Sequence, residues 1–114
     1  MMNFDIVEKA LLQSWSLKTS SKWTAENPYK GQCGVTAIVI QEFFGGDIYK
    51  TMVGMQWHFY NYIDNKRIDF TRKQFENHIE YNDIKTTRSD AFTDTNSEQY
   101  NALKAAFSVY LKTI

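Results

Sequence analysis

Residues 33–46 read Cys-Gly-Val-Thr-Ala-Ile-Val-Ile-Gln-Glu-Phe-Phe-Gly-Gly, and this stretch decides the fold. It is apolar almost without a break through Ile40, and the apolar character resumes at Phe43. Valine and isoleucine favour strands locally, but the run is long for a strand. The two glycines that end it are typical of a helix stop. We therefore predict a buried helix over residues 33–44.

The chain before this helix predicts another helix followed by a long loop. Apolar side chains recur at helical spacing over residues 4–16. Residues 14–30 are rich in Ser, Thr, Lys and Asn and read as a surface loop. Trp15 and Trp23 lie in this loop, so we expect it to fold back onto the core and not to be disordered.

After the two glycines, three short segments rich in Ile, Val, Tyr, Phe and Trp follow at close spacing, at 47–53, 56–63 and 66–70. Such spacing predicts an antiparallel meander. Asp64-Asn65 fits a two-residue hairpin turn between the last two strands.

The C-terminal third predicts a short helix at 72–76, mostly irregular chain at 77–95, and a last helix at 97–112. We interpret Asp94-Thr95-Asn96 as the cap of that last helix. The expected fold class is α+β, with the cysteine-bearing helix packed on a small antiparallel meander and with N- and C-terminal helices.

Length and composition indicate the number of domains and the kinds of partner that the protein can bind. With 114 residues, of which 43% are hydrophobic, the chain fits one domain over residues 1–114 with a core of its own. Thirteen Lys+Arg balance thirteen Asp+Glu, so we expect no nucleic-acid partner.

We also expect no membrane span or signal peptide. One cysteine cannot form an internal disulfide, which suits a cytoplasmic location. No feature specifies an oligomeric state.

Cys33 is the strongest candidate for a reactive group. It stands at the first turn of the predicted helix, where the aligned peptide dipoles carry a partial positive charge. That field favours the thiolate, which is the nucleophilic form. Gly31 and Gly34 flank the site and allow a substrate to approach closely.

His58 and Asp69 are candidates to complete the site. If Asp64-Asn65 forms a two-residue turn, His58 and Asp69 lie on one face of neighbouring strands and are diagonal neighbours. A three-residue loop would place Asp69 on the other face. The carboxylate can then fix the tautomer of the histidine, which acts as the base for a thiol nucleophile.

Other residues are assigned to the surroundings of this site. Free N–H groups at the helix start, next to Gly34, are suited to holding an oxyanion. The side chain of Gln32 or Asn27 can add a donor there. Trp57 and Tyr60 are expected in the core and in the wall of the cleft.

The chain also resembles a known family, the small bacterial YunG-like family, over nearly its whole length. The matching stretches are Ser14-Trp15-Ser16, Glu26-Asn27-Pro28, Lys30 to Ala37, Phe43-Phe44-Gly45-Gly46, Trp57-His58-Phe59-Tyr60-Asn61, Asp69-Phe70-Thr71 and Asp94-Thr95-Asn96.

A more distant resemblance is to papain-like and transglutaminase-like cysteine hydrolases. Gly31-Gln32-Cys33-Gly34 is similar to their nucleophile region, and the order Cys33, His58, Asp69 is the order of their catalytic residues. The resemblance implies a fold in which a cysteine-bearing helix packs on an antiparallel sheet. In those enzymes the oxyanion glutamine lies several residues before the cysteine, whereas Gln32 is adjacent to it.

Three functional hypotheses follow. The first is a thiol hydrolase or acyl transferase that uses Cys33, His58 and Asp69 on a peptide or small acyl substrate, with no cofactor. The second is a catalytically inactive module that binds a peptide or small ligand in the same cleft. The third is a zinc site made of Cys33, His58, Asp69 and His78, although their spacing matches no compact zinc motif.

Overall fold

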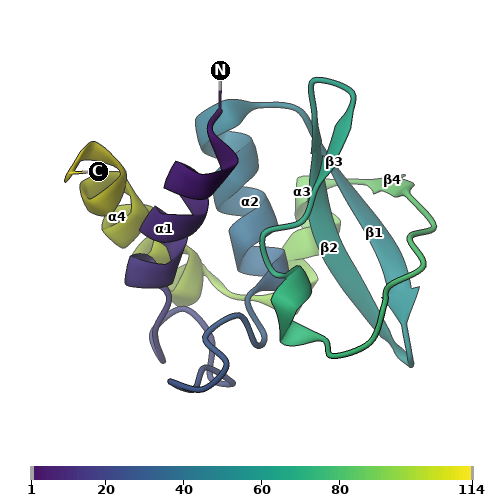
Figure 1. The fold of residues 1–114 in the computed structure, drawn as a ribbon, viewed down its shortest axis with the longest axis horizontal. Coiled ribbons are helices and arrows are strands. Elements are labelled where there is room, and N and C mark those ends of the chain that lie inside the picture. The colour runs from purple at the N-terminus through teal and green to yellow at the C-terminus, as the bar shows by residue number, and fades with distance from the viewer. Residues whose placement is uncertain (1, 114) are drawn as a thin grey trace.

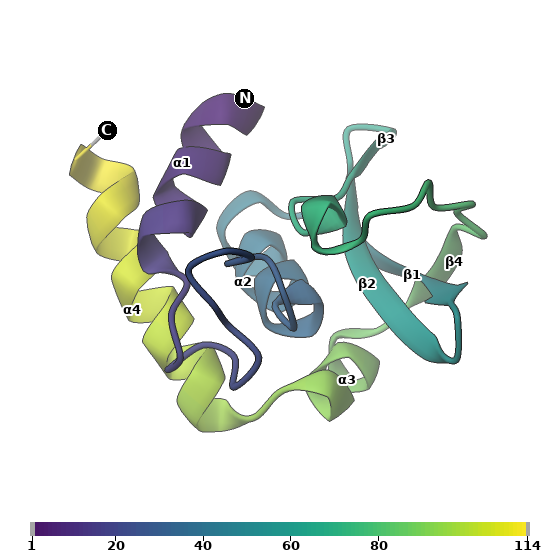
Figure 2. The same cartoon turned by 60° about the horizontal axis from the view of Figure 1, so that its bottom comes forward.

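The computed structural model describes residues 2–113 and shows a mixed α+β fold built around one central helix. This helix, α2 (Cys33–Phe44), has helices α1 (Phe4–Ser14) and α4 (Ser97–Thr113) on one side and the sheet on the other (Figures 1 and 2). The predicted bounds of α2 are confirmed.

Helix α2 is central because it is apolar all round. Its first eight residues, Cys33 to Ile40, are all buried. A helix with an apolar surface on every side must be covered on every side. Glu42 is the only charged residue in α2, and it lies in the last turn, where Gly45 ends the helix with a positive φ of 80°.

The sheet is antiparallel, in the order β3-β2-β1-β4. Its strands are β1 (Asp47–Val53), β2 (Gln56–Ile63), β3 (Lys66–Ile68) and β4 (Ile84–Thr86). The predicted meander is confirmed for β1 and β2, and β3 ends two residues earlier than expected.

The β2–β3 hairpin has the predicted two-residue turn. Asp64 and Asn65 both have positive φ, 53° and 62°, and Ile63 pairs with Lys66. Two consecutive residues at positive φ are typical of a hairpin turn whose twist matches that of the strands.

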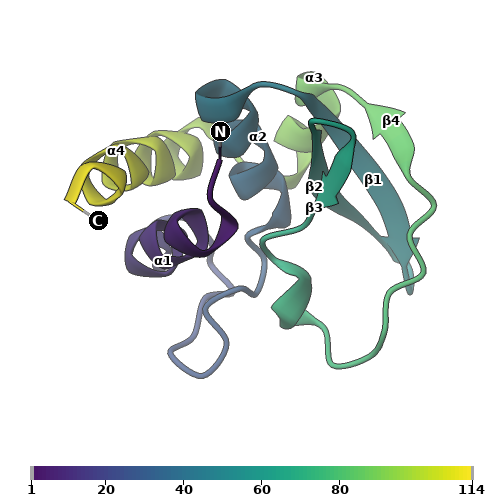
Figure 3. The ribbon, with the colours of Figure 1, turned by 45° about the horizontal axis from the view of Figure 1, so that its top comes forward.

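The segment after β3 crosses from one edge of the sheet to the other, as Figure 3 shows. It contains a short 3-10 helix, η1 (Arg72–Gln74), and returns as β4 beside β1. A four-residue helix, α3 (Arg88–Ala91), and a 3-10 turn, η2 (Phe92–Asp94), follow. The prediction of mostly irregular chain over 77–95 is therefore wrong.

One predicted helix end needs correction, whereas the predicted cap at Asn96 is confirmed. Helix α1 ends at Ser14 and not at residue 16, because Trp15 turns to extended backbone. Asn96 caps α4, with its Oδ1 accepting a hydrogen bond from the Gln99 N–H at 2.8 Å. Asp94 takes no part in that cap.

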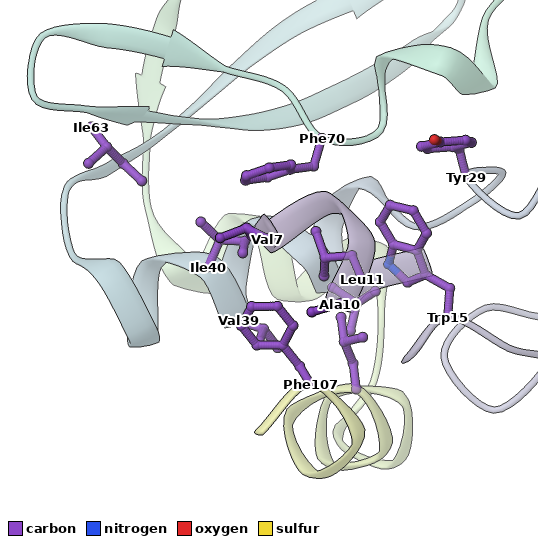
Figure 4. Packing of buried hydrophobic residues seen from close by; sticks show 12 residues of the cluster. Val7, Ala10, Leu11, Trp15, Tyr29, Val39, Ile40, Ile63, Phe70 and Phe107 are labelled. Carbon is purple, nitrogen blue, oxygen red and sulfur yellow. The ribbon is translucent and has the colours of Figure 1, made fainter. Parts of the chain in front are cut away.

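The loop after α1 is held on the core as predicted. Trp15 is buried, and its indole N–H donates to Thr36 Oγ1 in α2 at 2.9 Å. Its ring meets Tyr29 edge to face (Figure 4). Trp23 packs against the same cluster. The loop is therefore fixed against the start of α2.

Phe107 of α4 is at the centre of the helical layer. It is fully buried (Figure 4) and contacts Phe43 edge to face, with ring centroids 5.0 Å apart. We expect Phe107→Ala to lower the free energy of unfolding by about 3–5 kcal/mol, because it removes a large side chain from a packed core. Urea unfolding measures this change.

Val109→Ala, in the same helix but 59% exposed, is the matched control. It should change the free energy of unfolding by less than about 0.5 kcal/mol. Equal effects of the two substitutions would show that Phe107 does not anchor α4.

Candidate functional site

Cys33 is the first residue of α2, and its side chain is held by a carboxylate from another part of the chain. The residue is 7% exposed. Its Sγ lies 3.3 Å from Asp94 Oδ2, and the same oxygen accepts a hydrogen bond from the Gly34 N–H at 3.0 Å. The carboxylate thus occupies the helix start, where backbone N–H groups and the helix dipole favour an anion.

Gly34 is required for this contact. A Cβ built on Gly34 would lie 2.6 Å from Asp94 Oδ2 and 2.7 Å from Asp94 Cβ, so any larger residue pushes Asp94 away. Asp94 lies in η2, which places it over the first turn of α2. Sequence reasoning missed Asp94, although the residue lies in a stretch shared with the YunG-like family.

The pKa of the Cys33 thiol is shifted upward, whereas the sequence analysis expected it to be lowered. Burial raises the pKa of the Cys33 thiol well above its usual range, and the negative charge of Asp94 raises it further. A hydrogen bond from the Phe59 backbone acts in the opposite direction but is weaker. The prediction that the helix start favours the thiolate is therefore wrong for this conformation. Desolvation and the nearby carboxylate outweigh the helix dipole.

The pKa of the Asp94 carboxyl group is also shifted from its usual value. Burial raises the pKa of its carboxyl group, while hydrogen bonds from the Cys33 thiol and the Gly34 N–H, together with the charge of Lys22, lower it. In the hydrogen bond between these two groups, the thiol is the donor and the carboxylate is the acceptor.

His58 and Asp69 form the contact that the hairpin register implies. His58 Nε2 lies 2.6 Å from Asp69 Oδ2. The pairing of Ile63 with Lys66 places both residues on one face, as expected from the two-residue turn. Both side chains are buried, with 1% and 6% of their areas exposed.

Asp69 is held by further hydrogen bonds. Its Oδ2 also accepts from the Tyr81 hydroxyl at 2.8 Å, and its Oδ1 accepts from the Thr71 N–H at 3.2 Å and from the Thr71 hydroxyl at 3.4 Å. The carboxylate is therefore fixed in place, and it fixes the ring of His58 in turn. Tyr81 was not expected here, because it comes from the segment that crosses the sheet.

The second ring nitrogen of His58 is not used in the hydrogen-bond network of the site. Nδ1 is buried and has no hydrogen-bond partner among residues 2–113. In the described part of the chain, the Cys33 thiol donates to Asp94 and makes no hydrogen bond to His58. His58 and Cys33 nevertheless line the same cavity.

This cavity, which we call the Cys33 cavity, has a volume of about 240 Å³. Exposed Lys22 and Lys30 contribute to its wall. Its remaining lining residues are Gly31, Cys33, Val53, Gln56, Trp57, His58, Gln74, Phe75 and Asp94. The cavity thus brings Cys33, His58 and Trp57 together, and Asp69 lies behind His58.

Three other expected residues lie elsewhere. Gln32 is fully buried, and its Oε1 accepts from the Thr19 hydroxyl at 2.9 Å, so its side chain does not line the Cys33 cavity. Asn27 donates to the backbone carbonyl of Gln74 at 3.4 Å and is not part of the lining either. Tyr60 donates its hydroxyl hydrogen to Asp83 at 2.7 Å and stacks on the His58 ring, but it does not line the cavity.

Residues 2–113 contain no cluster of three or more His, Cys, Asp or Glu side chains arranged to hold a metal ion. No helix in this range has the length and apolar character to cross a membrane.

Comparison with known proteins identifies the family of the chain. The model of the YunG protein family matches residues 3–112. The chain belongs to the YunG family. A curated YunG relative, the uncharacterized protein YunG of Bacillus subtilis (strain 168), is 55% identical over 108 residues, which cover 95% of this chain and 94% of the relative. No solved structure matches the chain.

The contact between Asp94 and Cys33 generates a prediction for this YunG-family protein. Asp94→Asn removes the charge that raises the pKa of the thiol, so the thiolate fraction below that pKa should increase. We expect the rate of iodoacetamide labelling at pH 7–8 to rise about tenfold or more. Glu98→Gln, which removes an exposed acid from the first turn of α4, should leave the rate unchanged.

Gly34→Ala tests the same contact from the other partner. Its Cβ would displace the Asp94 carboxylate. We expect labelling of Cys33 to accelerate as in Asp94→Asn, with a loss of about 1–3 kcal/mol in the free energy of unfolding from overpacking. Slower labelling in a folded Gly34→Ala protein would contradict the proposed role of Asp94.

Proposed function

We propose that this protein is a thiol hydrolase or acyl transferase of the papain-like or transglutaminase-like kind. The observation that carries the proposal is the arrangement of His58. Its Nε2 is bound to a fixed carboxylate, and its other nitrogen is left without a partner beside the cavity that contains Cys33.

The arrangement assigns a role to each of the three residues. His58 Nδ1 takes the proton of the Cys33 thiol, and the sulfur forms a bond to the carbonyl carbon of an amide, ester or thioester. Asp69 holds the ring of His58 and stabilises the imidazolium. Collapse of the tetrahedral intermediate expels the leaving group, which takes the proton from His58. Water, or an amine, then accepts the acyl group.

The Asp94 contact adds a requirement to this scheme. In the structure the thiol donates to Asp94, which keeps it protonated. The thiol therefore has to exchange its contact with Asp94 for one with His58 before it attacks. Entry of a substrate carbonyl into the Cys33 cavity, next to the helix start, would displace the carboxylate and permit that exchange.

An activated ester tests the proposal. Incubation with p-nitrophenyl acetate should add one acetyl group to Cys33, as measured by intact-protein mass spectrometry and by release of nitrophenolate. Cys33→Ala should abolish the modification. His58→Ala should slow acylation by about 10²-fold or more, because it removes the base.

His78→Ala is the matched control, since His78 is the second histidine of the chain, is exposed, and does not line the cavity. It should be acylated at the wild-type rate. If Cys33 is not acylated, or if both histidine variants behave alike, the thiol-enzyme proposal fails and a binding module on the same fold becomes the better reading.

A further inference from the structure

Gln74 is a second polar side chain in the Cys33 cavity with an unused hydrogen-bonding group. Its Nε2 is buried and has no partner among residues 2–113. The residue belongs to η1 and lines the cavity together with Cys33 and His58. A buried donor without an acceptor is costly, and a ligand in the cavity that supplies an acceptor would remove that cost.

The orientation of this amide is set by its other end. Gln74 Oε1 accepts a hydrogen bond from the Gly31 N–H at 3.4 Å. The opposite assignment of the amide atoms would place a donor against that N–H, so the contact fixes oxygen toward Gly31 and nitrogen away from it.

The position of Gly31 is also fixed. Its φ is +72°, and an added Cβ would lie 2.4 Å from Ser20 Oγ, so both the backbone angle and the available space require glycine. The backbone carbonyl of Gln74 accepts from the Asn27 amide at 3.4 Å. Gln74 is thus tied at two points to the loop that leads into Cys33, which gives its free N–H group a defined place.

We propose that Gln74 Nε2 is the side-chain donor that holds the oxyanion formed at Cys33. The inference rests on the proposed function. It replaces Gln32 and Asn27, neither of which lines the cavity. Gln32 Nε2 is also buried without a partner, but the residue lies outside the lining, and the Asn27 amide donates to the Gln74 carbonyl. Among the other side-chain donors of the lining, Lys22, Lys30, Gln56 and Trp57 are exposed, and His58 is the base.

In the acylation step the Cys33 sulfur bonds to the carbonyl carbon, and the electron pair of the C=O π bond moves to oxygen. Gln74 Nε2–H and the backbone N–H of Cys33 then donate to that oxyanion. Donors already in place at such a site stabilise the transition state more than the neutral carbonyl of the substrate.

The test compares two reactions of the same sulfur. Acylation by p-nitrophenyl acetate forms an oxyanion, whereas alkylation by iodoacetamide at a saturated carbon does not. In Gln74→Leu we expect the acylation rate to fall about 10²–10³-fold while the alkylation rate stays within about threefold of wild type. His58→Ala should slow both reactions.

Gln74→Glu is the second variant. It keeps an oxygen that can accept from the Gly31 N–H but replaces the N–H donor by a negative charge, so it should also lose acylation. Gln56→Leu, which makes the same change at the exposed rim of the cavity, should retain most of the acylation rate.

Three outcomes would count against the inference. Acylation of a folded Gln74→Leu protein at the wild-type rate overturns it, and so does an equal loss in acylation and alkylation. A wild-type protein that is alkylated but never acylated at Cys33 overturns the proposed function and this inference together. The first two outcomes overturn only the inference and leave the proposed function in place.

Discussion

Everything in this fold depends on covering a helix that is apolar on all sides. Helix α2 cannot present any face of its first eight residues to water, so α1 and α4 must close one side and the sheet the other. The same enclosure buries the start of the helix. A thiol and several backbone N–H groups therefore lie in a site with little water, where contacts with charged groups have large effects.

The site shows two opposing electrostatic arrangements around one sulfur. On one side, Asp94 holds the thiol and keeps it protonated. On the other, Asp69 orients His58 with one nitrogen left over. The first arrangement protects a buried thiol against unwanted reactions, because the thiolate is the reactive form. The second is the one that the proposed chemistry would use, and under that proposal a ligand in the Cys33 cavity would decide between them.

The parts of the fold that the sequence predicts well are those with a local cause. Helix α2 has a continuous apolar run and a glycine stop, and the β2–β3 register follows from the two-residue turn at Asp64-Asn65. That register also predicts the contact between His58 and Asp69. Elements β4, α3 and η2 have three or four residues each, too few to show a period, and they form because β1 and α2 are already in place.

Side-chain direction is the part that the sequence could not provide. Gln32 is adjacent to Cys33 in the chain, yet its Oε1 accepts from Thr19 and its side chain does not line the cavity. Gln74 and Asp94 are far from Cys33 in sequence and line the same cavity. Chain neighbours at a helix start diverge because successive residues leave the helix in different directions. The cavity is instead assembled from segments brought together by packing.

The two edge strands bear on how a peptide could be recognised. Strands β3 and β4 have only three residues each, and they are the outer strands of the sheet. Short edge strands offer few unpaired main-chain groups, which discourages strand addition by a partner chain. A peptide that reaches Cys33 would therefore gain little from extending the sheet. Its recognition would depend on the acyl end that enters the cavity, so this architecture favours small acyl donors and chain ends over internal segments of a polypeptide.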